Sequence, residues 1–365
     1  MISISKNTSL RLSCQFSQLR ISTNLDYVDV IIGVDGEELL SGRYFASGGW
    51  AVISDMQSLL EEAMRQRQLS LMAVDVVAYH DINDSSLADY DRTTYGVLFC
   101  DRQPEVGFNA DTFAHHFLTA ASSRRIAPQA SVLLGFYAAA GESLAYDVIA
   151  DYVVNGQAAQ AVIHGQGEGI ASVAIVYTLG FQLSYIRQKV EQLAGLAVEL
   201  LGFTVRCGNR SASFYVDRDI APLDAFYFRN CFNLPDQIFL PADTVTKTKA
   251  ERSVATLADS SLFYDFSAEQ SFEVQSGGLT PAECHLAAQL FTAHEVNKPY
   301  ADGIEELDFD AMPPVLITES TCEFSRLSDK PNSVKFTWRY ATNGCTHPAL
   351  PFSDIFTEPF NYVFK

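Results

Sequence analysis

The sequence predicts a mainly β protein with a minority of helix, built as tandem β-sandwich-like domains with a few packed helices. Segments of strand length alternate between apolar and polar residues, and Asp-Gly and Asn-Gly turns separate several of them. The chain also contains 25 Phe and 16 Tyr, and aromatic side chains favour the pleated, half-buried surface of a sheet. Hydrophobic residues make up 48% of the sequence, which is enough for a sizeable core.

The first third predicts several strands. In residues 27–34, Val28, Val30 and Ile32 fall on one face of the expected strand. Asp35-Gly36 is a strong turn signal, so residues 37–45 should return as the partner strand. Further strands are predicted over residues 11–16, 50–53, 71–79 and 95–100.

Two helices stand out, near residues 55–67 and 281–294. Ser54 or Asp55 can cap the first, and apolar residues then recur at helical spacing. The second has Thr280 as N-cap, Pro281 at the first helical position and Glu283 to complete a capping box. Residues 186–196 show a third helical pattern, which is short and contains Gly195 near its end.

The remaining two thirds predict more strands, with hairpin turns at Asn155-Gly156 and Gly208-Asn209. The last strand, residues 334–340, places Val334, Phe336 and Trp338 on one face. We predict three domains: residues 1–122 with one helix, residues 123–241, and an α+β domain over residues 242–365. The other expected strands cover residues 132–138, 144–154, 159–164, 172–178, 203–207, 213–216, 238–240, 244–248, 272–275 and 315–318.

Composition excludes some classes of partner. The chain has 44 acidic and 25 basic residues, a net charge of −19, whereas a nucleic-acid binder needs a basic face. The densest basic spots are Arg124-Arg125 and the pair Lys247 and Lys249. No stretch reaches the roughly 18 apolar residues of a membrane-spanning helix. We therefore expect neither nucleic acid nor membrane insertion.

The N-terminal residues and the cysteines indicate the cellular compartment in which the protein is made. The first residues lack the apolar core and cleavage site of a signal peptide, so we expect cytoplasmic synthesis. The 7 cysteines form no C-x-x-C motif and are odd in number. Such a set predicts reduced thiols, most of them buried.

The glycine-rich segment from Gly165 to Ile170 invites comparison with a nucleotide-binding loop. A dinucleotide fingerprint needs Gly-x-Gly-x-x-Gly between a strand and a helix. Here the spacing is Gly-x-Gly-x-Gly and a strand is predicted next. A β-turn is the favoured interpretation, and we expect no cofactor.

Metal-ligand patterns are weak. His115 and His116 are adjacent, so they point in different directions in any regular element. Cys345 and His347 could share one strand face, but two ligands do not make a zinc site. A polar loop offers four carboxylates without the glycine and glutamate of an EF-hand: Asp81, Asp84, Asp89 and Asp91. We assign no metal ligand.

No catalytic motif is present, and we predict that the chain is not an enzyme. The Walker loop and the Gly-x-Ser-x-Gly elbow are both absent. A hydrolase with a carboxylate pair remains open, because only the separation of the two groups in space identifies it. The densest acidic run contains Glu305, Glu306, Asp308 and Asp310, and a solvated loop is its simpler interpretation.

Several stretches between Phe203 and Ala341 resemble one family. They are FYFRNCFNLPDQIFL, TKTKAERSVA, FEVQSGGLTPAECHLAAQLFTAHEV, VLITESTCEFS and VKFTWRY. The family comprises uncharacterised proteins encoded by gut-bacterial genomes and their prophages, associated with phage tail or baseplate-type structural genes. The resemblance implies a β-rich assembly component and no reaction.

Three functional hypotheses follow. The first is a non-catalytic structural protein of a phage tail or phage-like particle, whose partners are other copies of itself or other particle proteins. The alternative is a carbohydrate- or cell-surface-binding module that uses exposed aromatics such as Trp50. The third is an unrecognised hydrolase. Light scattering, glycan binding and the separation of buried carboxylates distinguish them.

Overall fold

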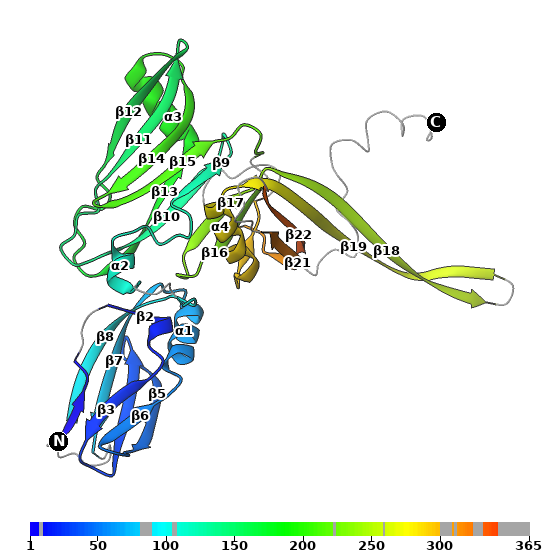
Figure 1. Cartoon of the computed structure of the whole chain (residues 1–365). Helices are drawn as coiled ribbons and strands as arrows, with labels where there is room; N and C mark the ends of the chain where they lie inside the picture. The colour runs from blue at the N-terminus through cyan, green and yellow to red at the C-terminus, as the bar shows by residue number, and fades with distance from the viewer. Residues whose placement is uncertain are drawn as a thin grey trace, which may run out of the picture.

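The computed structural model describes residues 1–6, 10–80, 90–103, 108–221, 224–257, 260–299, 309, 312–323 and 331–341. Sheets dominate these residues and four α-helices accompany them, so the predicted mainly β class is confirmed. Figure 1 shows three lobes: an N-terminal lobe, a central lobe, and a C-terminal lobe from which a long hairpin projects.

The N-terminal lobe packs two sheets against each other around an aliphatic core. One sheet has the order β1-β3-β6, with strands Ile2–Ile4, Leu19–Thr23 and Trp50–Ile53. The other has the order β2-β8-β7-β4-β5, with strands Arg11–Leu12, Tyr90–Leu98, Leu71–Tyr79, Tyr27–Val34 and Glu37–Phe45. Helix α1, Met56–Gln66, contributes Met56, Leu60 and Met64 to the core.

The strands predicted over residues 27–34, 37–45, 50–53 and 71–79 are confirmed with the same bounds. The strand predicted over residues 11–16 is wrong beyond Leu12, because a 3-10 turn (η1, Ser13–Gln15) follows. There the Ser13 hydroxyl donates to the Cys100 carbonyl at 3.1 Å and accepts from the Cys100 N–H at 2.9 Å. Such side-chain bonds to the backbone compete with a strand ladder.

The start of α1 differs chemically from the prediction. Asp55 is the N-cap residue, but its side chain makes no capping hydrogen bond. Its φ of 59° lies in the left-handed region, which aspartate tolerates better than most residues. The helix is therefore positioned by its buried face and not by its cap.

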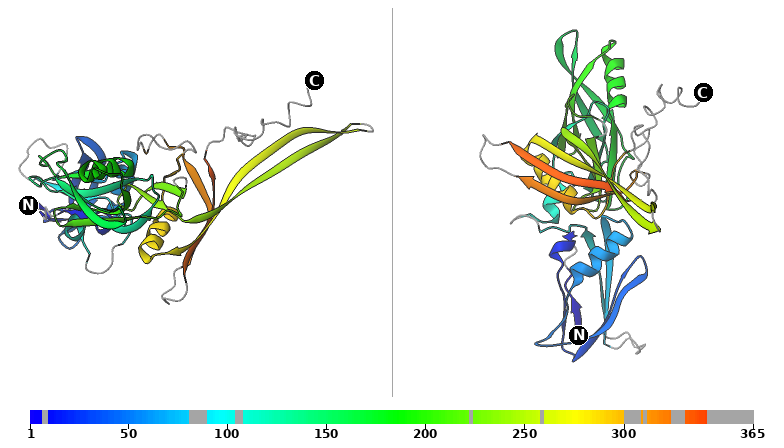
Figure 2. Two further views of the ribbon diagram at one scale, coloured as in Figure 1. Left: turned by 90° about the horizontal axis from the view of Figure 1, so that it is seen from above. Right: turned by 90° about the vertical axis from the view of Figure 1, so that its right-hand side faces the viewer.

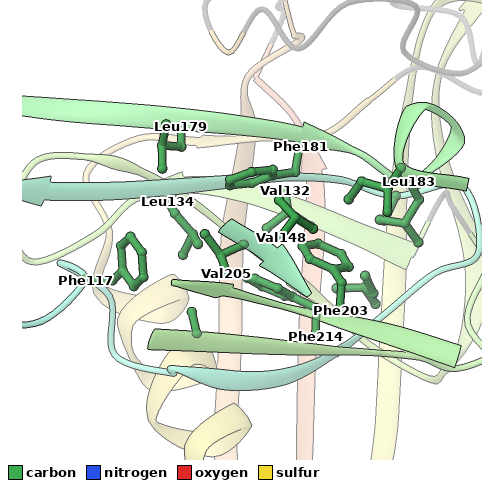
Figure 3. Close-up of a cluster of buried hydrophobic side chains, with 14 of the residues drawn as sticks. Phe117, Val132, Leu134, Val148, Leu179, Phe181, Leu183, Phe203, Val205 and Phe214 are labelled. Atoms are coloured by element: carbon green, nitrogen blue, oxygen red, sulfur yellow. The ribbon is translucent and has the colours of Figure 1, made fainter. Parts of the chain in front are cut away.

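The central lobe packs the pair β10-β13 against the sheet β12-β11-β14-β15-β9. Figure 3 shows its core, where Phe181, Phe203 and Phe214 come together from three strands; the last two rings stack with centroids 4.9 Å apart. The elements are α2 (Ala110–Ala114), β9 (Ser123–Ile126), β10 (Ser131–Ala138), β11 (Tyr146–Val154), β12 (Gln157–Gly165), β13 (Ile175–Gln182), α3 (Leu183–Ala194), β14 (Glu199–Cys207) and β15 (Arg210–Val216).

The C-terminal lobe combines two sheets and helix α4, Pro281–Thr292, whose predicted capping box is present. The small sheet has the order β17-β16-β20, with strands Pro235–Phe239, Ala225–Arg229 and Val296–Asn297. The large sheet has the order β18-β19-β22-β21, with strands Ala242–Leu257, Ser260–Leu279, Asn332–Tyr340 and Val315–Glu323. The small sheet therefore joins strands from both sides of the predicted boundary at residue 241.

Strands β18 and β19 form an arm that extends far beyond the body of the molecule (Figures 1 and 2). The predicted strands over residues 244–248 and 272–275 are wrong in length, because β18 has 16 residues and β19 has 20. Strand β22 pairs with β19 only between Phe272 and Leu279. Beyond that point, β18 and β19 pair only with each other among the described residues.

Two adjacent arginines of β9 join the central lobe to the C-terminal lobe. Arg124 Nη1 lies 2.6 Å from Asp236 Oδ1 of β17, and both side chains are almost fully buried. Arg125 Nη2 lies 2.9 Å from Glu283 Oε2 of α4. Successive side chains of a strand point to opposite sides. The short strand β9 therefore contacts two elements of the C-terminal lobe, β17 and α4.

Glu283 connects this contact to the helix cap. Its carboxylate accepts from the backbone and side chain of Arg125 and from the backbone of Thr280. These bonds outweigh burial and hold the pKa of Glu283 below its ordinary value of 4.5. A buried carboxylate with this many charged hydrogen bonds stabilises the fold in its ionised form.

We expect Glu283→Gln to lower the free energy of unfolding by about 2–4 kcal/mol at pH 7, because Arg125 loses its charged partner. The depressed pKa means that the wild-type advantage is present above pH 4.5 and is lost as the pH falls through the folded-state value. Urea denaturation at pH 7 and pH 4 measures both effects. Glu62→Gln, at an exposed position of α1, is the control; equal losses for the two variants would contradict the prediction.

Candidate functional site

The glycine-rich segment is a turn between strands. Strand β12 ends at Gly165, and the next regular element is strand β13, so no helix follows as a dinucleotide site requires. A Cβ at Gly165 would overlap the ring of Tyr146, and Gly167 has a positive φ of 55°. Close packing and backbone conformation therefore explain these glycines without a nucleotide.

The metal candidates that the structure describes are not brought together. His115 and His116 are both exposed at the end of α2. Asp91 accepts from the Ile4 N–H and pairs with Lys6 at 3.2 Å. No group of three or more His, Cys, Asp and Glu in the described parts of the chain could hold a metal. Cys345, His347, Asp81, Asp84 and Asp89 lie outside the described residues.

The acidic run with Glu305, Glu306, Asp308 and Asp310 also lies outside the described residues. Glu61 of α1 and Asp101 are two carboxylates that share one arginine, Arg65. Arg65 Nη2 is 3.8 Å from Glu61 Oε2 and 3.5 Å from Asp101 Oδ2. Burial raises the pKa of both carboxyls above their ordinary values.

This carboxylate pair does not have the form of a hydrolase site. A glycosidase keeps the space between its two carboxyls open for the substrate, whereas here a guanidinium occupies it. A shallow cavity along α1 is lined by Glu61 and Arg65 but not by Asp101. The three groups act as an ion bridge that holds α1 against the end of β8.

The C-terminal lobe contains a cavity that we call the root pocket, because it lies at the root of the arm. It has a volume of about 290 Å³ and lies between Phe226 of the small sheet and strands β18, β19 and β22 of the large one. Its lining consists of Asp224, Phe226, Leu240, Ala242, Thr244, Thr246, Phe272, Val274, Lys298, Pro299, Trp338 and Tyr340.

Aromatic rings form most of its wall. Phe272 stacks on Trp338 with centroids 4.2 Å apart, and the Tyr340 ring meets Trp338 edge-on at 5.2 Å. Phe226 closes the other side, 5.8 Å from Trp338. These edge-on and stacked contacts pack the rings against one another.

Lys298 and Asp224 are the charged residues of the root pocket. The Nζ atom of Lys298 lies 4.2 Å from the centroid of Phe226 and 5.3 Å from that of Trp338, and it donates to the Ala225 carbonyl at 3.4 Å. Burial lowers the pKa of Lys298 from 10.5 to about 8, and the nearby Asp224 carboxylate only partly opposes this shift. The ammonium is therefore desolvated but still mainly protonated at neutral pH.

The pleat of the arm separates two unlike faces. The neutral face continues the pocket floor and comprises Ala242, Thr244, Thr246, Thr248 and Ala250 of β18 with Gln270, Phe272 and Val274 of β19. The opposite, charged face comprises Asp243, Val245, Lys247, Lys249 and Glu251 with Glu269, Ser271, Glu273 and Gln275. On the charged face Glu273 pairs with Lys247 and with Lys335 of β22.

The alternation over residues 334–340 predicts that Trp338 lies on the core face of its strand, but nothing in the sequence marks Lys298. A single lysine outside any motif carries no signal, and its neighbours come from four distant strands. Trp50, the aromatic named for glycan binding, is 48% exposed on β6. A glycan-binding aromatic must be exposed, and Trp50 meets that requirement.

Carbon-13 NMR of reductively methylated lysines tests the environment of Lys298. We expect one dimethyl-lysine signal to titrate with a midpoint near pH 8, because burial disfavours the ammonium. Lys298→Arg assigns that signal, and Lys335, whose pKa is raised by Glu273, serves as the internal reference. A Lys298 midpoint above that of Lys335 would refute the assignment.

Glu61→Gln tests the ion bridge. The pH dependence of stability should be opposite to that of Glu283, because the pKa of Glu61 is raised and that of Glu283 is lowered. Since the pKa of Glu61 is raised, its contribution to stability is present at low pH and is lost as the pH rises through the folded-state value. At pH 7 we expect the free energy of unfolding of Glu61→Gln to lie less than about 1 kcal/mol below that of wild type. Between pH 4 and pH 7 the free energy of unfolding of wild type should fall relative to that of the variant. Urea denaturation measures both; a loss as large as that of Glu283→Gln would contradict the prediction.

Comparisons with known proteins add little. No family model and no curated protein matches the chain. A crystal structure from Bacteroides ovatus, described as structural genomics of unknown function, is 8% identical over 93% of this chain and 94% of that chain, with a TM-score of 0.20. A likeness at that score carries no argument about fold or function. Within the described residues, no helix has the length and hydropathy needed to cross a membrane.

Proposed function

We propose that this chain is a non-catalytic assembly protein that binds other copies of itself through the arm. The observation that carries the proposal is the two-stranded part of the arm. Isolated two-stranded ribbons are at best marginally stable in water and need a third strand or a packed face. Over residues 247–257 and 260–271, β18 and β19 have no other strand beside them among the described residues.

The neutral face supports a second copy as the partner. In a twofold dimer the same surface meets itself, so a patch of one charge would repel its own image. The chain carries a net charge of −19, yet the neutral face has no charged side chain between Ala242 and Ala250. Thr244, Thr246 and Thr248 are all exposed on it, and small side chains allow two sheets to approach closely.

We further propose that the assembly is a phage tail, baseplate or related particle. The resemblance of the stretches between Phe203 and Ala341 to prophage-encoded structural proteins supports this part, and the arm is compatible with it. The genes beside this one provide the test. Tail-tube, sheath or baseplate genes would support the particle, whereas a glycan-uptake operon would contradict it.

Thr248→Glu tests the role of the neutral face. Two opposed carboxylates in a twofold contact repel each other, so we expect the dissociation constant of the assembly to rise at least tenfold. Light scattering over a concentration series should give wild type a mass above the 40.2 kDa of one chain, and the variant should fall towards it.

Ser271→Glu is the matched control, because the same change is made on the same ribbon but on the charged face. Its new carboxylate lies opposite Lys247, so the ribbon should remain intact and the assembly unchanged. A wild-type mass of one chain at every concentration would refute self-assembly. Equal weakening by both variants would refute the choice of face.

A further inference from the structure

Three buried thiols meet where the N-terminal lobe contacts the rest of the chain. Cys14 of η1 and Cys100, which follows β8, belong to the N-terminal lobe, and Cys231 follows β16 of the C-terminal lobe. All three are free thiols of one small hydrophobic cluster, and none is more than 9% exposed. We propose that this cluster is an oxidation site, at which a peroxide links Cys100 to Cys231 by a disulfide across the two lobes.

The turn that carries Cys231 is a point of attachment of the N-terminal lobe. The Asp101 N–H donates to the Cys231 carbonyl at 3.2 Å. Two residues farther along the turn, the Asn233 carbonyl accepts from the Ser70 hydroxyl at 3.1 Å, and the Asn233 amide donates to the Leu69 carbonyl at 3.0 Å. These contacts are neutral hydrogen bonds, each of which contributes only about 1 kcal/mol. A covalent bond at the same turn would therefore restrain the two lobes much more strongly.

The way in which the chain segments are joined favours Cys231 over Cys14 as the partner of Cys100. The segments of Cys100 and Cys231 share a direct backbone hydrogen bond, and segments joined in this way run about 5 Å apart. That spacing lies within the roughly 4.4–6.8 Å between Cα atoms that a disulfide spans. On the Cys14 side the contact is made by the Ser13 hydroxyl, which bonds to the Cys100 N–H and carbonyl. This intervening side chain separates the two backbones.

Cys100 is the middle thiol of the three. Hydrogen bonds from the thiols of Cys14 and Cys231 outweigh burial and lower the pKa of Cys100, and the same bonds raise the pKa of both neighbours. When it is protonated, the Cys100 thiol can donate to the Arg102 carbonyl at 3.2 Å. The Gln289 amide donates to Cys231 Sγ at 3.3 Å and holds that sulfur in the cluster. Because the thiolate is the nucleophilic form, Cys100 is the sulfur that reacts first.

The oxidation balances with hydrogen peroxide as the oxidant. The Cys100 thiolate attacks one peroxide oxygen, the O–O bond breaks, and the leaving hydroxide takes the proton of the Cys231 thiol to form water. The Cys231 thiolate then attacks the sulfur of the Cys100 sulfenic acid, the S–O bond breaks and the S–S bond forms. The second hydroxide takes up the proton that Cys100 released on ionisation. Two thiols thus lose two electrons, and one peroxide is reduced to two waters.

Peptide mapping of the folded, full-length chain tests the proposal after treatment with hydrogen peroxide. Free thiols are alkylated in denaturant without reductant, and the band at the 40.2 kDa of one chain is digested with trypsin and analysed by mass spectrometry. The cysteines Cys14, Cys100 and Cys231 fall in separate tryptic peptides, residues 12–20, 93–102 and 230–247. We expect the Cys100–Cys231 linked pair to be roughly tenfold more abundant than the Cys14–Cys100 pair, and to disappear on reduction.

Cys207→Ser is the matched control, because Cys207 is also buried but belongs to the core of the central lobe. Oxidation should raise the urea midpoint of wild type and of Cys207→Ser more than that of Cys231→Ser, since the link restrains the unfolded chain. A Cys14–Cys100 pair as the main product, or Cys100 recovered unlinked as a thiol or a sulfinic acid, would overturn the proposal. The peptide map of wild type gives this result even if Cys231→Ser fails to fold, and the one-chain band keeps it separate from assembly through the arm.

Discussion

The arrangement of the central and C-terminal lobes depends on the two adjacent arginines of β9. Each captures a buried carboxylate from the neighbouring lobe, Arg124 that of Asp236 and Arg125 that of Glu283. Because the two acids belong to a strand and a helix, translation and rotation of the lobes are both restrained. The arm extends from the C-terminal lobe, on whose strand and helix these contacts act (Figure 1).

The Arg124 contact specifies geometry more than it adds stability. Its Nε and Nη2 atoms are buried without an acceptor among the described residues, although the guanidinium lies 5.3 Å from the ring centroid of Phe214. Desolvation of such a pair can cost as much as its attraction returns. Removing one partner is nevertheless severe, since it leaves a lone charge in the core, and that penalty makes other arrangements of the lobes unfavourable.

Sequence patterns predicted the parts of the fold in which burial alternates regularly. Residues 27–34 and 37–45 were placed with the observed bounds because an apolar stripe and an Asp-Gly turn coincide there. The arm was predicted only near Thr244–Thr248 and Phe272–Gln275, where the large sheet still has a covered face. Between Lys249 and Ser271 charged, small and aromatic residues follow one another without a regular apolar alternation. Lys298 was missed because its environment is made by strands that only the tertiary fold brings together.

The same pleat produces both candidate surfaces, so the register of β18 and β19 decides what each face can bind. A slip of one residue would move Lys247 onto the neutral face and Thr246 away from the root pocket, because side chains alternate strictly. Pairing with β22 places Phe272 opposite Trp338 and so fixes which face of β19 continues the pocket. An irregularity between Ser253 and Val254 changes the register farther out, so the neutral face ends before it. The aromatic packing at the root therefore sets the chemistry of the exposed ribbon.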